Sequence, residues 1–225
     1  AFKSNFSKLE KINMEISFEN ILTLENSRNI AIKNGVLAFK DDLPRVKAKM
    51  LYKNKKINSE IRLKGDRKLH WADKDKSSYK VELKKNQYIF GVNKFSIHKP
   101  GVRNYIHEWI FHEMMEDFGL IKVKYEFFDF YINGTNHGLY VLEEGMGKEL
   151  IERNNRRNGP IFAGLSEIQT SVDGPYLQIY NKKFWNKPDN ILIAKTARQN
   201  FIDFMNGDRS LEKTFDIEKF AAFFA

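Results

Sequence analysis

The sequence predicts an α+β protein with two lobes. Segments with the alternating pattern of β-strands are concentrated in its first two thirds, with one amphipathic helix pattern among them, and helical patterns dominate the rest. We expect residues 1–44 to be an N-terminal extension ending at Pro44. Residues 45–144 are expected to form a strand-rich N-terminal lobe, and residues 145–225 the start of a helical C-terminal lobe, incomplete at Ala225.

The composition limits the class of protein. The chain has 225 residues, of which 42% are hydrophobic, so it can bury a sizeable core. It contains no apolar run long enough to span a membrane, and its lack of cysteine excludes disulfides and thiolate metal sites. The net charge of +9 favours an anionic partner: nucleic acid, a phosphorylated small molecule, an acidic protein or a membrane surface.

Residues 124–144 predict a β-hairpin around which the chain is organised. The first half is rich in aromatic residues, and Asn133-Gly134 is a pair that tolerates the positive φ angles of a tight turn. The return strand ends in Glu143-Glu144, followed by a glycine-containing segment. Carboxylates at the end of a core strand are candidates for a ligand site, although solvated surface acids give the same pattern.

Further strands are expected at residues 45–52 and 58–63, which flank a polar turn, and at residues 78–83 and 94–97. Alternation within residues 78–83 places Tyr79, Val81 and Leu83 on one face of the strand and Lys80 and Glu82 on the other.

A helix is predicted over residues 102–118, because apolar residues recur there at intervals of three and four. We expect it to pack on the sheet with Tyr105, Trp109 and Met114 buried, and Glu113, beside that face, to need a cationic partner. Helices are also expected at residues 148–154, 191–205 and 217–224, and strands at residues 159–164 and 176–180.

The common nucleotide-binding, zinc and serine-hydrolase motifs are absent from the sequence. Instead, an ordered set of short segments resembles the spore coat protein H (CotH) kinase family. These segments are residues 62–65 (RLKG), 76–83 (KSSYKVEL), 90–95 (FGVNKF), 103–104 (RN), 132–134 (ING) and 138–144 (GLYVLEE). The resemblance covers about residues 45–225 and depends on their order, since no single segment is specific.

The resemblance implies an atypical protein-kinase-like fold of two lobes, with an antiparallel sheet and one packed helix in the N-terminal lobe. It also implies transfer of the γ-phosphoryl group of ATP to Ser or Thr of a protein substrate, with Mg²⁺ or Mn²⁺ as the metal. By the same resemblance, the substrate is expected to be a coat or surface protein, and the location a bacterial spore coat or cell envelope.

Phosphoryl transfer relies on positioning and charge stabilisation, which suggests roles for the matched residues. Lys80 is the candidate phosphate-binding lysine with Glu113 as its helix partner, while Tyr79 is the alternative side chain facing the nucleotide. The other candidates for ATP binding are Glu144 for the nucleoside, Lys64 and Gly65 for a phosphate-covering loop, and Arg103 at a helix N-terminus.

The family's catalytic Asp and metal motif are expected beyond Ala225, so we expect a truncated kinase whose 225-residue chain is inactive alone. The alternative is a non-catalytic pseudokinase or scaffold that binds an anionic partner through a basic cleft. A nucleic-acid partner is disfavoured, because the strand aromatics alternate inward instead of forming an exposed stacking platform.

Overall fold

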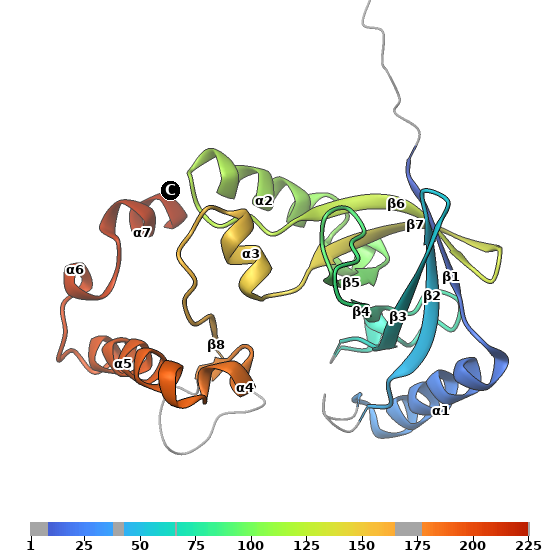
Figure 1. Ribbon diagram of the computed structural model, residues 1–225, viewed down its shortest axis with the longest axis horizontal. Helices are drawn as coiled ribbons and strands as arrows, with labels where there is room; N and C mark the ends of the chain where they lie inside the picture. Colours follow the sequence, from blue (N-terminus) through green and yellow to red (C-terminus); the bar gives the residue numbers. More distant parts are fainter. Residues whose placement is uncertain (1–8, 38–42, 66, 165–176, 225) are drawn as a thin grey trace, which may run out of the picture. The chain divides into compact units, whose positions relative to one another are not determined.

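A computed structural model describes residues 9–37, 43–65, 67–164 and 177–224. The chain divides into two compact units, the first containing residues 1–111 and 123–145 and the second containing residues 112–122 and 146–225. The α+β class predicted from the sequence is confirmed (Figure 1).

The first unit is a closed β-barrel of seven strands. They are β1 (Lys11–Glu15), β2 (Val46–Tyr52), β3 (Lys55–Leu63), β4 (Tyr79–Leu83), β5 (Lys94–His98), β6 (Tyr125–Ile132) and β7 (Thr135–Glu144). Their order is β1-β2-β3-β4-β5-β7-β6. All neighbours are antiparallel except β1 and β6, whose parallel pairing closes the barrel. The prediction of a purely antiparallel sheet was therefore wrong, because β1 joins the two free edges that such a sheet would expose.

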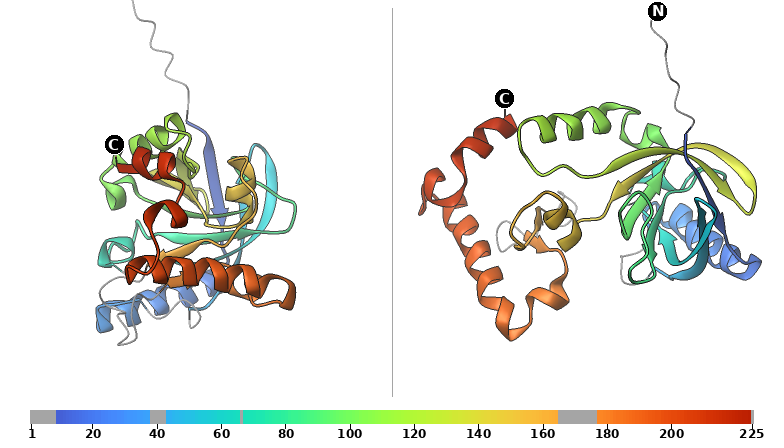
Figure 2. Two further views of the ribbon diagram at one scale, coloured as in Figure 1. Left: turned by 90° about the vertical axis from the view of Figure 1, so that its left-hand side faces the viewer. Right: turned by 45° about the horizontal axis from the view of Figure 1, so that its top comes forward.

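The predicted hairpin of β6 and β7 is confirmed, and Figure 2 shows it from two further directions. Asn133 and Gly134 form its turn with φ angles of 49° and 84°. The Asn133 side chain also fastens this turn to the segment after β1. Its Oδ1 accepts a hydrogen bond from Ile16 N at 2.8 Å, and its Nδ2 donates one to Ile16 O at 2.9 Å.

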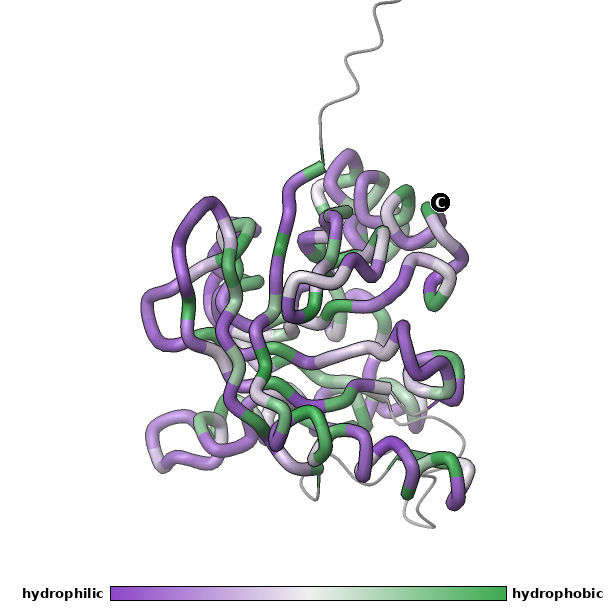
Figure 3. Tube along the Cα trace, turned by 90° about the vertical axis from the view of Figure 1, so that its right-hand side faces the viewer, coloured by the Kyte–Doolittle hydropathy of each residue, from purple (hydrophilic) through white to green (hydrophobic). Residues whose placement is uncertain are grey.

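The alternation predicted for β4 is also confirmed. Tyr79, Val81 and Leu83 belong to the buried core, whereas Lys80 and Glu82 are only half-buried on the other face. Hydropathy changes repeatedly along the barrel strands for the same reason (Figure 3). Fully buried side chains fill the interior, the largest being Trp71, Tyr140, Phe95, Phe128 and Phe130.

Residues expected to form an N-terminal extension contribute to this barrel. Besides strand β1, they contain helix α1 (Phe18–Asn34), which is capped by the Ser17 side chain and ends at Gly35 in the left-handed conformation. Leu24 and Ala31 of α1 are buried in the barrel core. Strand β1 is short and α1 buries few side chains, so neither gives a strong local pattern.

The predicted helix at 102–118 is shorter and its expected burial was wrong. Helix α2 spans His107–Asp117, because Pro100–Arg103 forms a 3₁₀ turn, η2, and Asn104 and Tyr105 have positive φ. The buried positions also differ from those expected. Tyr105, Trp109 and Met114 are 68%, 40% and 47% exposed, whereas His112 and Met115 are buried. Helix α1 packs on strands β2 and β3 of the barrel.

The described residues of the second unit are mainly helical. Besides the end of α2, its elements are α3 (Lys148–Arg153), β8 (Phe162–Gly164), β9 (Leu177–Ile179), α4 (Lys182–Trp185), α5 (Pro188–Met205), α6 (Leu211–Thr214) and α7 (Ile217–Phe224). Strands β8 and β9 pair as a separate two-stranded sheet. In the part of the chain that the structure describes, no helix is both long and apolar enough to cross a membrane.

Alanine substitutions at Gly65, after β3, and at Gly134, in the β6–β7 turn, should differ in their cost to stability. Gly65 has a φ of +99°, and a Cβ there would lie 2.2 Å from the His70 ring, so Gly65→Ala should lower the free energy of unfolding by roughly 2–5 kcal/mol. Gly134 has a φ of +84° but open space around it, so Gly134→Ala should cost about 1–2 kcal/mol. Urea denaturation of both variants measures this, and equal costs would contradict the close contact.

Candidate functional site

A row of polar side chains crosses four strands on the face opposite the core. In the strand register, Arg62 on β3 pairs with Lys80 on β4, Lys80 with Ser96 on β5, and Ser96 with Glu143 on β7. Neighbouring strands lie about 5 Å apart, so Lys80 and Glu143 are separated by about 10 Å along this row. The row brings together residues from distant parts of the sequence.

Glu143 is the centre of this polar face. Its carboxylate lies 2.6 Å from Lys64 Nζ, 3.2 Å from His98 Nε2 and 3.8 Å from an Arg103 guanidinium nitrogen. The Lys64 and Glu143 side chains are only 17% and 16% exposed. Burial alone raises the pKa of Glu143, but the hydrogen bond to His98 and the charge of Lys64 outweigh it and hold the pKa well below its usual range.

Two buried histidines line the same face. Both ring nitrogens of His98 face oxygen acceptors, Nε2 towards Glu143 and Nδ1 towards Lys99 O at 3.1 Å. His70 lies edge-on to His98 with 6.4 Å between ring centroids, and its Nδ1 is 3.1 Å from Ser78 Oγ. Burial and the positive charge of Lys64 lower the pKa of His70 to about 4. His70 is therefore neutral near pH 7.

The structure separates the two alternatives left open for β4. Lys80 projects on the face that carries Glu143, whereas Tyr79 points into the core, where burial raises the pKa of its hydroxyl to about 12. The orientation of Lys80 thus agrees with a site on the outer face. Tyr79 instead packs near Phe130, with ring centroids 6.5 Å apart.

The two acidic residues at the end of β7 lie on different faces. Glu143 faces the cations, while Glu144 pairs in register with the core residue Phe95 and is only 4% exposed. A Glu144 carboxylate oxygen accepts a hydrogen bond from the Lys124 backbone N–H at 3.1 Å. The role of Glu144 as the nucleoside contact stays a prediction, and Glu143 is the more accessible of the two carboxylates.

The other residues predicted from the sequence lie at the ends of elements or on α2. Lys64 and Gly65 directly follow β3, and Arg103 ends η2 instead of lying in the first turn of α2. Glu113 on α2 forms an ion pair with Lys122 at 2.8 Å, which supplies the cation that its position beside apolar residues required. Its predicted role as the partner of Lys80 stays a prediction.

Sequence reasoning missed Glu143 and His98 as a pair. Alternation along β7 separates Glu143 from Glu144, but only the pairing of β5 with β7 brings His98 close, and the sequence does not give that pairing. Within the described ranges, no group of three or more His, Asp or Glu side chains is arranged to hold a metal ion. We therefore assign no residue to a metal.

The lowered pKa of His70 predicts a pH dependence of stability. The unfolded chain takes up a proton near pH 6.5 but the folded chain only near pH 4, so the free energy of unfolding should fall with decreasing pH across this window. The full effect is on the order of 3 kcal/mol. Protonation of Glu143 lowers the free energy of unfolding further, beginning below about pH 4.5.

Urea denaturation between pH 7 and pH 5 tests this expectation. His70→Gln should flatten the slope of stability against pH, whatever its effect on absolute stability. His107→Gln is the matched control, because His107 is exposed on α2. An undiminished slope in His70→Gln would show that another group causes it.

Comparison with known proteins identifies the family. No curated protein matches the chain. A family model described as CotH kinase protein matches residues 61–225, which is more than half of the sequence. The match begins within β3 and includes β4 to β7, so it contains Lys64, His98 and Arg103, which contact Glu143. Strands β1 and β2, helix α1 and most of β3 precede it. The chain belongs to the CotH kinase protein family.

Proposed function

We propose that this chain is the nucleotide-side portion of a CotH kinase that transfers the γ-phosphoryl group of ATP to Ser or Thr of a protein substrate. The observation that carries the proposal is the partly buried Lys64–Glu143 ion pair, with Arg103 against the same carboxylate. Family membership supports a kinase-like function in general. The choice of ATP, of Ser or Thr, and of a protein substrate is our inference.

The ion pair suits phosphate binding for a physical reason. Phosphoryl transfer depends on fixed cations that counter the charge of the phosphates, and protein kinases orient such a lysine with a carboxylate. Glu143 holds the Lys64 ammonium at 2.6 Å, so less side-chain entropy is lost when a phosphate arrives. Arg103 adds a second cation, and its planar guanidinium group can bind two phosphate oxygens at once.

Lys80 extends this cationic face along the strand row. It lies between Arg62 on β3 and Ser96 on β5, and Glu143 lies beyond Ser96 on β7. We assign Lys80 to another part of the polyphosphate, and Gly65 to the backbone that borders it. A divalent metal bound with ATP would neutralise phosphate charge, and Mg²⁺ or Mn²⁺ is the class expected for this chemistry.

Calorimetric titration with ATP and Mg²⁺ tests the nucleotide site. Lys64→Met and Lys80→Met should each weaken binding roughly tenfold or more, because each removes a charge-assisted hydrogen bond to phosphate. Lys55→Met is the matched control, since Lys55 is exposed at the other end of β3 and should leave the affinity unchanged. If all three variants bind ATP as tightly as the parent chain, the proposed nucleotide site is wrong.

Two further ligands distinguish a nucleotide site from a scaffold that binds anions. A nucleotide site should bind ATP more tightly than tripolyphosphate, because the adenosine adds contacts of its own. If tripolyphosphate binds as tightly as ATP and the same lysines matter, the cationic face is a general anion site. That result would favour the pseudokinase or scaffold function over the kinase.

A further inference from the structure

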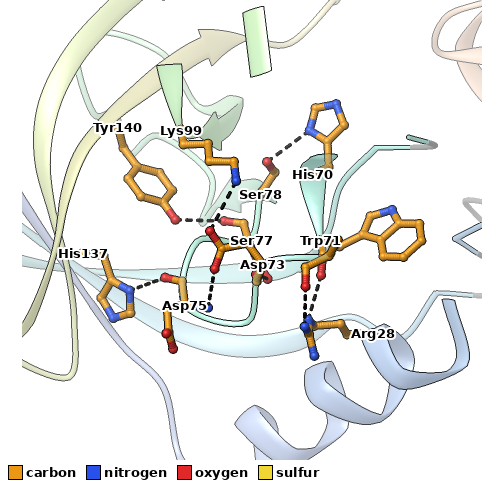
Figure 4. A network of polar contacts seen from close by, with 11 residues as sticks. Arg28, His70, Trp71, Asp73, Asp75, Ser77, Ser78, Lys99, His137 and Tyr140 are labelled. Atoms are coloured by element: carbon orange, nitrogen blue, oxygen red, sulfur yellow. Dashed lines mark hydrogen bonds and ion pairs between the residues drawn. The ribbon is translucent and has the colours of Figure 1, made fainter. Parts of the chain in front are cut away.

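The loop of residues 67–77, between β3 and β4, is fastened at several points to other elements of the barrel unit. Figure 4 shows these contacts, which come from α1, the β5–η2 junction and β7. The loop begins just after Lys64 and Gly65 and ends just before Ser78 and the strand that carries Lys80. Its position therefore affects both lysines of the proposed nucleotide site.

Arg28 on α1 makes the most specific of these contacts. Its Nε donates to Trp71 O at 2.7 Å, and a terminal guanidinium nitrogen donates to Ala72 O at 2.6 Å. A guanidinium group presents its donors in a rigid fork, so it can hold two successive carbonyls in one orientation. Arg28 is itself held in place, because Leu24 and Ala31 fix α1 in the core.

Three contacts hold the other end of the loop. The buried Tyr140 hydroxyl donates to Ser77 O at 3.2 Å, and His137 Nδ1 donates to Asp75 O at 2.6 Å. Lys99 Nζ lies 3.4 Å from an Asp73 carboxylate oxygen. Residues 73–77 are thereby anchored to β7 and to the β5–η2 junction, whereas Arg28 holds Trp71 and Ala72.

A direct path leads from the residues that Arg28 holds to the lysines. Trp71 Nε1 donates to Gly65 O at 3.0 Å, which restrains the backbone next to Lys64. On the other side, Ser78 N donates to His70 O at 2.7 Å, and Ser78 O accepts from Lys64 N at 3.0 Å. Moving Trp71 and Ala72 would therefore disturb the backbone that carries Lys64 and the start of β4.

We propose that Arg28 is a positioning residue of the nucleotide site, which holds the 67–77 loop so that Lys64 and Lys80 meet the same polyphosphate. The inference rests on the proposed function, and it adds a residue outside the 61–225 family match. Arg28 does not touch the ligand in this arrangement. It acts through Trp71 and Ala72, and its effect depends on the shape of the guanidinium group as well as on its charge.

Hydrogen exchange of the 225-residue chain tests the positioning itself, without any ligand. The amides of Trp71, Ala72 and Ser78 are hydrogen-bonded within the loop and report on its order. Arg28→Met should speed their exchange at least about tenfold, the factor expected for losing a hydrogen bond from a charged donor. The amides of the β2–β3 pair should change by less than about twofold. Arg28→Lys should resemble Arg28→Met, because an ammonium group lacks the fork.

The control variant is Arg45→Met. Arg45 forms an exposed ion pair with Glu82 at 3.3 Å and makes no contact with the loop among the described interactions, so its loss should leave loop exchange unchanged. If exchange in Arg28→Met rises equally in the loop and in the β2–β3 pair, Arg28 is a general stabilising residue. If loop exchange does not rise, Arg28 does not hold the loop. Either result overturns the proposal.

ATP titration then separates this proposal from the proposed function. Arg28→Met should weaken ATP binding by about the factor measured for loop exchange, and saturating ATP should slow that exchange again. Faster loop exchange with unchanged ATP affinity would overturn the positioning role. If the parent chain binds no ATP, the proposed nucleotide site is wrong, and Arg28 cannot position it. The hydrogen-exchange data still decide whether Arg28 holds the loop.

Discussion

Closure of the barrel is the constraint on which the rest of the structure depends. Because β1 pairs with both β2 and β6, no edge of the seven-stranded sheet stays open, and the interior is filled by apolar and aromatic side chains. Inward side chains then supply the core, which leaves the outward positions available for polar groups. The row from Arg62 to Glu143 follows directly, since the register aligns the outward residues of β3, β4, β5 and β7.

Much of this architecture is readable from local sequence. The Asn133-Gly134 turn between aromatic strands and the alternation around Lys80 each specify their structure within a few residues, so both predictions were confirmed. Helix α2 shows where local periodicity fails. Its apolar residues have the right spacing, but left-handed Asn104 and Tyr105 delay its start, and spacing alone does not say which partner covers the face.

The candidate site is harder to predict because its contacts are distant in sequence. Lys64 and Glu143 are separated by 79 positions, and His98 and Glu143 by 45. Their meeting depends on β5 pairing with β7 instead of β6, a choice that no property of either strand reveals by itself. The segment around Arg28 was missed for a related reason. Its short strand and weakly buried helix show their role only in the folded barrel, which β1 closes and on which α1 packs.

The energetics of Glu143 favour a functional over a structural explanation for the cluster. Removing a lysine and a carboxylate from water costs much of what their attraction returns, so a partly buried ion pair is a poor source of stability. Apolar residues could cover the same strands at lower cost. Placing Lys64 and Arg103 around one carboxylate, with His98 beside them, instead fixes two cations on an outer face. That is the preorganisation that the proposed binding of a polyphosphate requires.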